Sequence, residues 1–174
     1  MNNIFGKIKV LSKELSSNPA VNSVPDKRAD EQPKHDLFDE LVTDVGLRKV
    51  VQQLFRDGHH ARAVEEAYKY IDNLVKKLSK PENEGLTGAK LMNFAFSPSS
   101  PILKLNSGGT TSEIDEQNGY MQIISGCMIG IRNPRAHECD WEDAEQRALQ
   151  LLVLANHLVE RIHLAECIPK KTAP

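Results

Sequence analysis

The sequence predicts an all-α protein. Apolar residues recur at intervals of three and four over several long stretches, and the strict alternation of a half-buried strand is almost absent. Clusters of Pro, Gly and Ser separate the periodic stretches. Amphipathic helices bury their apolar faces against one another, so we expect a helical bundle. With 174 residues, 40% of them hydrophobic, the chain is long enough to bury a core without disulfide or metal cross-links.

The first 35 residues differ in character from the rest. Their apolar residues fall at helical spacing and predict a short amphipathic helix: Ile4, Phe5, Ile8, Leu11 and Leu15. Residues 16–34 contain three prolines and no periodicity, which is typical of a linker. We therefore expect an N-terminal segment at 1–35, a helical domain at 36–166 and a C-terminal tail at 167–174.

The helical domain is expected to begin with two helices. Periodic apolar residues from Leu37 to Phe55 predict one helix, bent near Gly46 and ended by Asp57 and Gly58. A second helix is predicted from His60 to Leu78, where Ser79, Lys80 and Pro81 follow.

A shorter helix and a long connection come next. Thr87 is a candidate N-cap for a helix over 88–96, which the prolines that follow would end. Residues 102–105 predict a short extended piece before the turn at 106–109. Connections of this length in a helical domain are usually functional or mobile.

Two more long helices complete the expected fold. One is predicted from about Ser112 to Ile131, because Pro134 disfavours helical backbone at Asn133. The last is predicted to begin near Asp140 or Trp141 and to extend to Ile162.

Charge and cysteine usage exclude several classes of protein. Lys and Arg number 22 against 24 Asp and Glu, which excludes a polybasic nucleic-acid coat and an acidic disordered tail. No run approaches the roughly 18 apolar residues that a membrane span requires. The N-terminus lacks the pattern of a secretory signal, and the three cysteines form no CxxC pair. We expect a cytoplasmic protein with no membrane partner.

One short segment is not explained by core packing. Residues 132–137 read Arg-Asn-Pro-Arg-Ala-His, between two apolar helices where a plain connection would hold Gly, Ser or Asp. A guanidinium donates two parallel hydrogen bonds to a phosphate, and an imidazole exchanges protons near neutral pH. Arg132 and His137 together could therefore bind a phosphodiester and move a proton during its cleavage without a metal ion.

The order of motifs resembles that of HEPN domains, the higher eukaryotes and prokaryotes nucleotide-binding superfamily. Its signature is Arg-x4-His with an Asn directly after the Arg, as in Arg132, Asn133 and His137. Further segments look like a bacterial branch related to Ymh and abortive-infection proteins: 54–59, 63–67, 95–98, 115–122 and 125–138. The similarity covers about 36–164.

The resemblance implies a four- to five-helix bundle that homodimerises and brings two Arg/His motifs into a shared cleft. Catalytic members are metal-independent endoribonucleases, in which the RNA 2′-hydroxyl attacks the adjacent phosphate. By this resemblance Arg132 holds the scissile phosphate, His137 acts as general acid or base, and Asn133 orients one of them. It implies RNA as partner, no cofactor or metal, and a role in phage defence, abortive infection or toxin-like growth arrest. An antitoxin or defence-system protein would be a further partner.

Three more residues are candidates for contacts to RNA. Arg135 is expected to be a second phosphate contact, although the superfamily assigns it no fixed role. Gln117 and Tyr120 precede Arg132 on the same predicted helix, and they line either the cleft or the dimer seam. In HEPN toxins silenced by a nucleotidyltransferase a tyrosine lies two places after the His; here that place is Cys139, so this silencing is not expected.

Small residues give the dimer separate support. Ser125, Gly126 and Gly130 would allow another backbone to approach the helix that carries them. Glycine costs about 1 kcal/mol against alanine inside a helix, so packing must compensate for it.

Alternatives remain open at this stage. Arg132 and Arg135 could complement the dipole at a helix C-terminus, and Trp141 could stack on a base or anchor the core. The second class of function is a non-catalytic HEPN module that binds nucleotide or RNA, or only dimerises. The intact Arg132, Asn133 and His137 favour the ribonuclease, whereas the near-neutral charge favours the binding module.

Overall fold

The structure is a computed structural model that describes residues 36–80 and 85–168. The N-terminal helix and linker predicted for residues 1–35, and the tail beyond 168, lie outside the described residues. Within them the all-α class is confirmed, because helices hold most of the residues and the strands are two residues long. None of these helices combines the length and apolarity of a membrane span.

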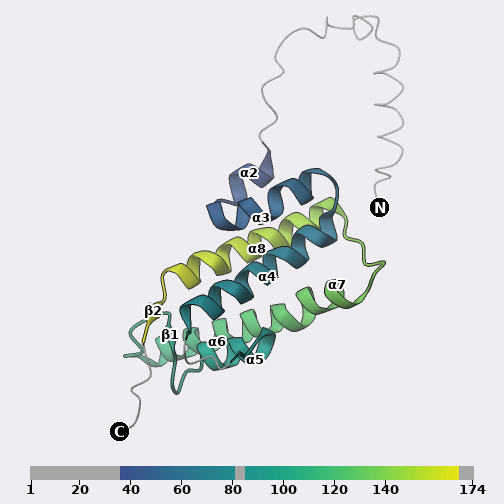
Figure 1. Ribbon diagram of the computed structural model, residues 1–174. Coiled ribbons are helices and arrows are strands. Elements are labelled where there is room, and N and C mark those ends of the chain that lie inside the picture. The colour runs from purple at the N-terminus through teal and green to yellow at the C-terminus, as the bar shows by residue number, and fades with distance from the viewer. Residues whose placement is uncertain (1–35, 81–84, 169–174) are drawn as a thin grey trace, which may run out of the picture. The chain divides into compact units, whose positions relative to one another are not determined.

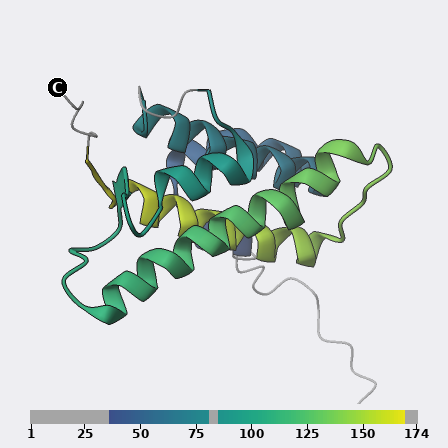
Figure 2. The same cartoon turned by 90° about the horizontal axis from the view of Figure 1, so that it is seen from below.

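The helices form a bundle around a central pair, α4 (His60–Leu78) and α8 (Glu145–His163), which lie side by side. Two helices pack against this pair: α2 (Leu37–Leu41) and α3 (Val45–Arg56). The helix α5 (Gly88–Ala95) packs against α4. Figure 2 shows the remaining stretch as one long rod: α6 (Thr111–Cys127), the π-helix η2 (Met128–Arg132) and α7 (Asn133–His137). The largest fully buried side chains include Tyr68, Phe38, Phe96, Leu47, Ile71 and Met128.

The first predicted helix is in fact two helices. We expected a bend near Gly46, but α2 ends at Leu41 and α3 begins at Val45. The Asp44 carboxylate accepts a hydrogen bond from Leu47 N at 2.7 Å and so caps α3. From α8, Asn156 Oδ1 accepts from the backbone N–H groups of Thr43 at 2.9 Å and Asp44 at 2.8 Å. This buried amide stabilises the non-helical backbone between α2 and α3.

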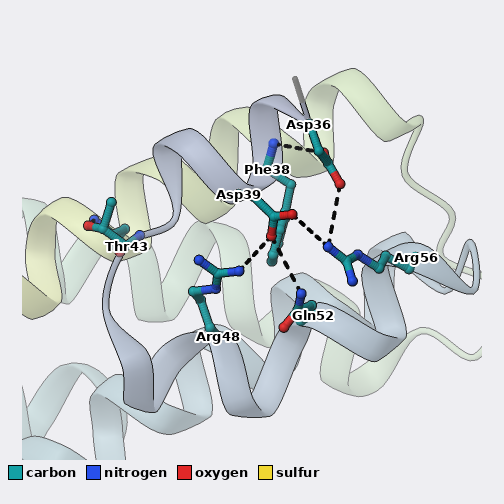
Figure 3. A network of polar contacts seen from close by, with 8 residues as sticks. Asp36, Phe38, Asp39, Thr43, Arg48, Gln52 and Arg56 are labelled. Atoms are coloured by element: carbon teal, nitrogen blue, oxygen red, sulfur yellow. Dashed lines mark hydrogen bonds and ion pairs between the residues drawn. The ribbon is translucent and has the colours of Figure 1, made fainter. Parts of the chain in front are cut away.

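A network of ion pairs joins the short α2 to α3 (Figure 3). Asp39 lies between two arginines of α3, 2.6 Å from Arg48 Nη2 and 2.7 Å from Arg56 Nη2. The two helices also share an aromatic contact, in which Phe38 stacks on Phe55 with ring centroids 4.9 Å apart. Because exposed ion pairs stabilise little individually, we assign most of the binding of α2 to the stacked rings and the orientation to the network.

The cap of α5 comes from another helix. Thr87 occupies the predicted N-cap position, but its side chain makes no capping bond. Asp72 of α4 replaces it, accepting from Gly88 N at 2.6 Å and from the Thr87 hydroxyl at 3.0 Å. Gly88 has a φ of 60°, a conformation that favours glycine, so the chain enters α5 by a turn that few other residues would allow.

The extended piece predicted at 102–105 pairs with a segment that we placed partly in the tail. Strand β1 (Leu103–Lys104) is antiparallel to β2 (Glu166–Cys167), with Leu103 opposite Cys167. Ile168 N donates to Ile102 O at 2.8 Å. The domain therefore extends past its predicted end at 166, and the sheet lies at the opposite end of the bundle from α7 (Figure 1).

The three cysteines should differ sharply in reactivity. Cys127 is buried, and desolvation raises the pKa of its thiol, whereas Cys139 and Cys167 are exposed. At pH 8 we expect iodoacetamide to modify Cys139 and Cys167 in the folded protein, with Cys127 at least roughly tenfold slower. Peptide mass spectrometry over time measures this, and urea should abolish the difference. Equal rates for all three thiols before urea is added would contradict the packing of Cys127.

Candidate functional site

The candidate motif lies on a helix and not in a connection. We expected Pro134 to end the helix near Ile131, but the backbone stays in the right-handed helical region at Met128, Arg132 and Asn133. The π turn η2 explains the difference, since Asn133 N–H reaches back five residues to Met128 O. A proline near the start of a new α-helical segment is tolerated because its missing N–H would lack a partner there. Arg132 and His137 are therefore held by one rod.

Arg132 is held by its neighbour and retains an unused donor. Its Nη1 donates to the Asn133 side-chain oxygen at 3.1 Å, as expected if Asn133 orients it. Its Nε is buried and has no acceptor. A buried donor without a partner costs about 1–3 kcal/mol, so an acceptor that reached it after a movement of the side chain would be favoured there. Trp141 Nε1 and Arg161 Nε are buried without an acceptor as well.

His137 is the last residue of α7 and is exposed. Within the part of the chain that the structure describes, its imidazole has no hydrogen-bond or ion-pair partner. Five residues along an α-helix correspond to a rotation of about 140°, whereas side chains share a face at spacings of three and four. One copy of the chain thus directs Arg132 and His137 to different sides of the rod.

Arg135 has a different environment from the one predicted. Instead of facing a phosphate, its guanidinium is buried and donates twice to Asp143, from Nε at 2.6 Å and from Nη2 at 2.7 Å. Its Nη1 donates to Ile131 O at 2.6 Å. The side chains of Arg135 and Asp143 are only 2% and 0% exposed. The guanidinium is thereby committed to the protein, and we remove Arg135 from the phosphate contacts.

The sequence offered no signal for the partners of Arg135. Asp143 is one of several acidic residues between 138 and 145, and nothing distinguishes it from Glu142 beside it. Trp141, for which we considered base stacking, lies with its ring 5.4 Å from the Arg135 guanidinium carbon. A turn at 138–141 brings both residues back over α7, and this turn delays the start of α8 from the predicted 140–141 to Glu145.

Gln117 and Tyr120 are also occupied within the protein. Gln117 is buried; its oxygen accepts from Leu105 N at 2.9 Å, and its nitrogen donates to Phe96 O and Leu103 O. It therefore joins α6 to the strand connection, and a contact to RNA would break these bonds. The Tyr120 hydroxyl lies 2.8 Å from His157 Nε2 on α8. This placement directs Tyr120 toward α8, at a distance of three helical turns from Arg132.

The described residues form hollows at both ends of the bundle. One of about 770 Å³ lies beside β1 and is lined by residues such as Lys104, Asn106 and Ile114, far from the motif. Two smaller hollows lie near α7. One of about 390 Å³ is lined by residues such as His60, Arg62 and Trp141, and one of about 290 Å³ lies between Arg62 on α4 and the 135–141 stretch. Ligand pockets usually measure about 300–1,000 Å³. Size thus favours the hollow near β1, whereas the phosphate chemistry lies at the other end, and we give the chemistry more weight.

An exposed face of the rod leads into the π turn. Ile123 and Ile129 are 47% and 59% exposed, and Gly126 and Gly130 lie on the same exposed side. A Cβ atom built on either glycine would meet no atom within 4 Å. Ser125, which we grouped with these glycines, is instead buried against the domain. The protein's own packing therefore does not require glycine at 126 or 130.

The comparisons with known proteins supply a family. The sequence profile of a family described as "Protein of unknown function (Hypoth_ymh)" matches residues 42–162. The chain belongs to this family. Its matched segment contains α3 to α8 almost entirely, with the Arg-x4-His motif and the Arg135–Asp143 pair inside it. No curated protein and no solved structure matches the chain.

Truncation of Gln117 should weaken the fold and not a ligand contact. In Gln117→Ala three buried backbone groups lose their partner, and each such loss costs about 1–3 kcal/mol. We expect urea unfolding to show a loss on the order of 3 kcal/mol. The matched control is Gln122→Ala, an exposed position of the same helix, which should change stability by less than about 0.5 kcal/mol. Equal stability of the two variants would contradict this role.

Proposed function

We propose that this Ymh-family chain is a metal-independent endoribonuclease of the HEPN type, acting as a homodimer. The observation that carries the proposal is the state of Arg132. Its guanidinium is oriented by Asn133 and keeps a buried Nε without an acceptor, five residues before an exposed and unpaired imidazole. The resemblance to HEPN domains supports the same reading and suggests a role in phage defence or toxin-like growth arrest.

The chemistry needs one phosphate ligand and two proton transfers. The RNA 2′-oxygen attacks the adjacent phosphorus and loses its proton, while the bond from phosphorus to the 5′-oxygen breaks and that oxygen gains a proton. The products are a 2′,3′-cyclic phosphate and a 5′-hydroxyl. Arg132 stabilises the charge that develops on the phosphate oxygens, because its donors are oriented before the reaction begins. His137 carries one of the two proton transfers, because its exposed imidazole has no hydrogen-bond or ion-pair partner among the described residues and can meet the substrate.

A second copy completes the site in this proposal. Arg132 and His137 diverge by about 140° on one rod, so the two groups that meet at one phosphate come more readily from two copies. The exposed face that ends at the π turn offers the surface: Ile123, Gly126, Ile129 and Gly130. Glycines inside a helix cost about 1 kcal/mol each, and close approach of a partner backbone is what would compensate for them.

The second candidate is a non-catalytic module that binds nucleotide or RNA. The near-neutral charge of the chain favours this candidate, because non-specific binding of an RNA substrate usually draws on a basic surface. This candidate is retained because the two classes give opposite results in a single assay.

That assay follows cleavage of total RNA by purified protein in EDTA. We expect cleavage with 2′,3′-cyclic phosphate ends, unchanged by the chelator, because Arg132 and His137 replace the functions of metal ions. His137→Ala should lower the rate by roughly 10²–10⁴ and Arg132→Ala by about 10²–10³. Arg132→Lys should recover only part of the loss, since an ammonium lacks the two-pronged geometry.

The control for these variants is His163→Ala, which removes an exposed imidazole at the far end of α8. It should cleave like the parent, and all variants must retain the parent's circular dichroism. Cleavage by His137→Ala at the parental rate would end the catalytic proposal and leave the binding module. Loss of cleavage in EDTA with recovery in Mg²⁺ would reject the metal-independent mechanism.

If the exposed face is the dimer interface, a bulky residue on it should weaken the dimer without lowering the stability of the single chain. Light scattering should give twice the 19.4 kDa of one chain. In Gly126→Leu the new side chain meets open space within one chain, so thermal stability at low concentration should not fall. Overpacking of a close contact costs about 1–3 kcal/mol, so the dimer dissociation constant should rise roughly 5- to 150-fold.

The matched control is Gln150→Leu, an exposed position on α8, which should leave the dimer unchanged. A Gly126→Leu protein that dimerises as tightly as the parent would place the interface elsewhere. A parent that scatters as a single chain at micromolar concentration would reject the dimer itself.

A further inference from the structure

The Arg135–Asp143 pair does more than join two segments. Two of its three hydrogen bonds connect α7 to the turn before α8, and the third, from Nη1 to Ile131 O, enters the π turn. The same guanidinium therefore touches the backbone directly before Arg132 and the carboxylate of Asp143. Trp141 covers the guanidinium, and Arg147 Nε lies 3.6 Å from Asp143 Oδ1, the oxygen that also accepts from Arg135 Nη2.

The backbone at this point needs support from a side chain. A π turn has wider hydrogen-bond spacing than an α-helix, and Pro134 supplies no N–H to the ladder. The segment that carries Arg132, Asn133 and His137 thus has fewer backbone bonds than a regular helix of the same length. The side chain of Arg135 supplies an additional hydrogen bond there, to Ile131 O, which lies between the start of the π turn at Met128 and Pro134.

Stability alone does not account for a pair this deeply buried. Removal of two charges from water is costly, and apolar pairs of similar volume often replace such ion pairs without loss of stability. What an apolar pair cannot do is hold a carbonyl oxygen at a set position. The feature specific to Arg135 is the simultaneous contact with Asp143 and Ile131 O, for which the planar, forked guanidinium is suited and the lysine ammonium is not.

We propose that Arg135 and Asp143 are positioning residues, which fix the π turn so that Arg132 and His137 keep the orientation that the reaction needs. The proposal rests on the proposed ribonuclease function. Neither residue touches the substrate, since both side chains are buried. They act through Ile131 O on one side of the motif and through the 138–143 turn on the other.

The decisive variant replaces both charges together. The double variant Arg135→Met with Asp143→Leu removes the ion pair and the bond to Ile131 O, which together we call the clamp, without leaving a buried charge unpaired. This variant should therefore fold with a melting temperature near the parent's. Hydrogen exchange of the amides of 132, 133 and 135–137 should accelerate at least roughly tenfold, while those of α4 and α8 stay unchanged. The rate constant of cleavage should fall roughly 10- to 100-fold with little change in KM, because misplacement by about 1 Å is enough for such a loss.

Conservative variants and a distant pair provide the controls. Arg135→Lys keeps the charge opposite Asp143 but loses the fork, and should recover part of the protection from exchange and part of the rate. The control pair is Arg48→Gln with Asp39→Asn, which removes a 2.6 Å ion pair between α2 and α3. It should change neither the exchange of 132–137 nor the cleavage rate.

The two measurements separate the failure of this proposal from that of the ribonuclease. If the parent cleaves no RNA, the proposed function fails, and accelerated exchange in the double variant still supports the clamp. If the double variant folds with unchanged exchange at 132–137 and a parental rate, the pair positions nothing and the proposal is overturned. A double variant that fails to fold would also overturn it, because the pair would then support the whole domain.

Discussion

The arrangement of the motif depends on the buried bond between Arg135 and Asp143. Without it, a π turn followed by a proline would form a weakly supported part of the longest rod among the described residues. With it, the carbonyl of Ile131 and the turn at 138–141 are held by one guanidinium. The bond also explains the late start of α8, since the chain returns over α7 before the helix begins at Glu145.

The features of the fold that could be predicted are those whose cause is local. The helices α4 and α8 each have one apolar face, so periodicity predicted the bounds of α4 and the end of α8, whereas α8 begins at Glu145 and not at the predicted 140–141. The break between α2 and α3 has one local signal, the Asp44 cap of α3, which our prediction of one bent helix missed. Its other support comes from Asn156, more than a hundred residues away in sequence, and could not be predicted. The cap of α5 by Asp72 and the pairing of β1 with β2 could not be predicted either, because each joins residues that lie far apart in the sequence.

In the candidate site, too, the residues with a local signal could be predicted and the contacts with distant residues could not. Arg132, Asn133 and His137 could be identified because an unusual set of residue types stands in a short segment, and the Arg132–Asn133 bond is between neighbours. Arg135 looked equivalent to Arg132 in the sequence, since both are arginines of one hexapeptide. The two arginines differ because Arg135 has the buried Asp143 as its partner. The sequence does not show which acid of this acidic stretch is buried, so the difference could not be predicted.

With Arg135 committed to Asp143, Arg132 is the one arginine of the motif whose guanidinium keeps a free donor. Around it the turn before α8 exposes Glu138, Asp140 and Glu142, which repel a polyanion. This charge weakens the binding of RNA, whether by an enzyme or by a binding module. The rate of an enzyme's chemical step depends less on such binding, because only contacts that strengthen in the transition state accelerate it. In the proposed enzyme Arg132 would therefore act on the charge that develops at the phosphate, while the imidazole of a second copy moves the proton.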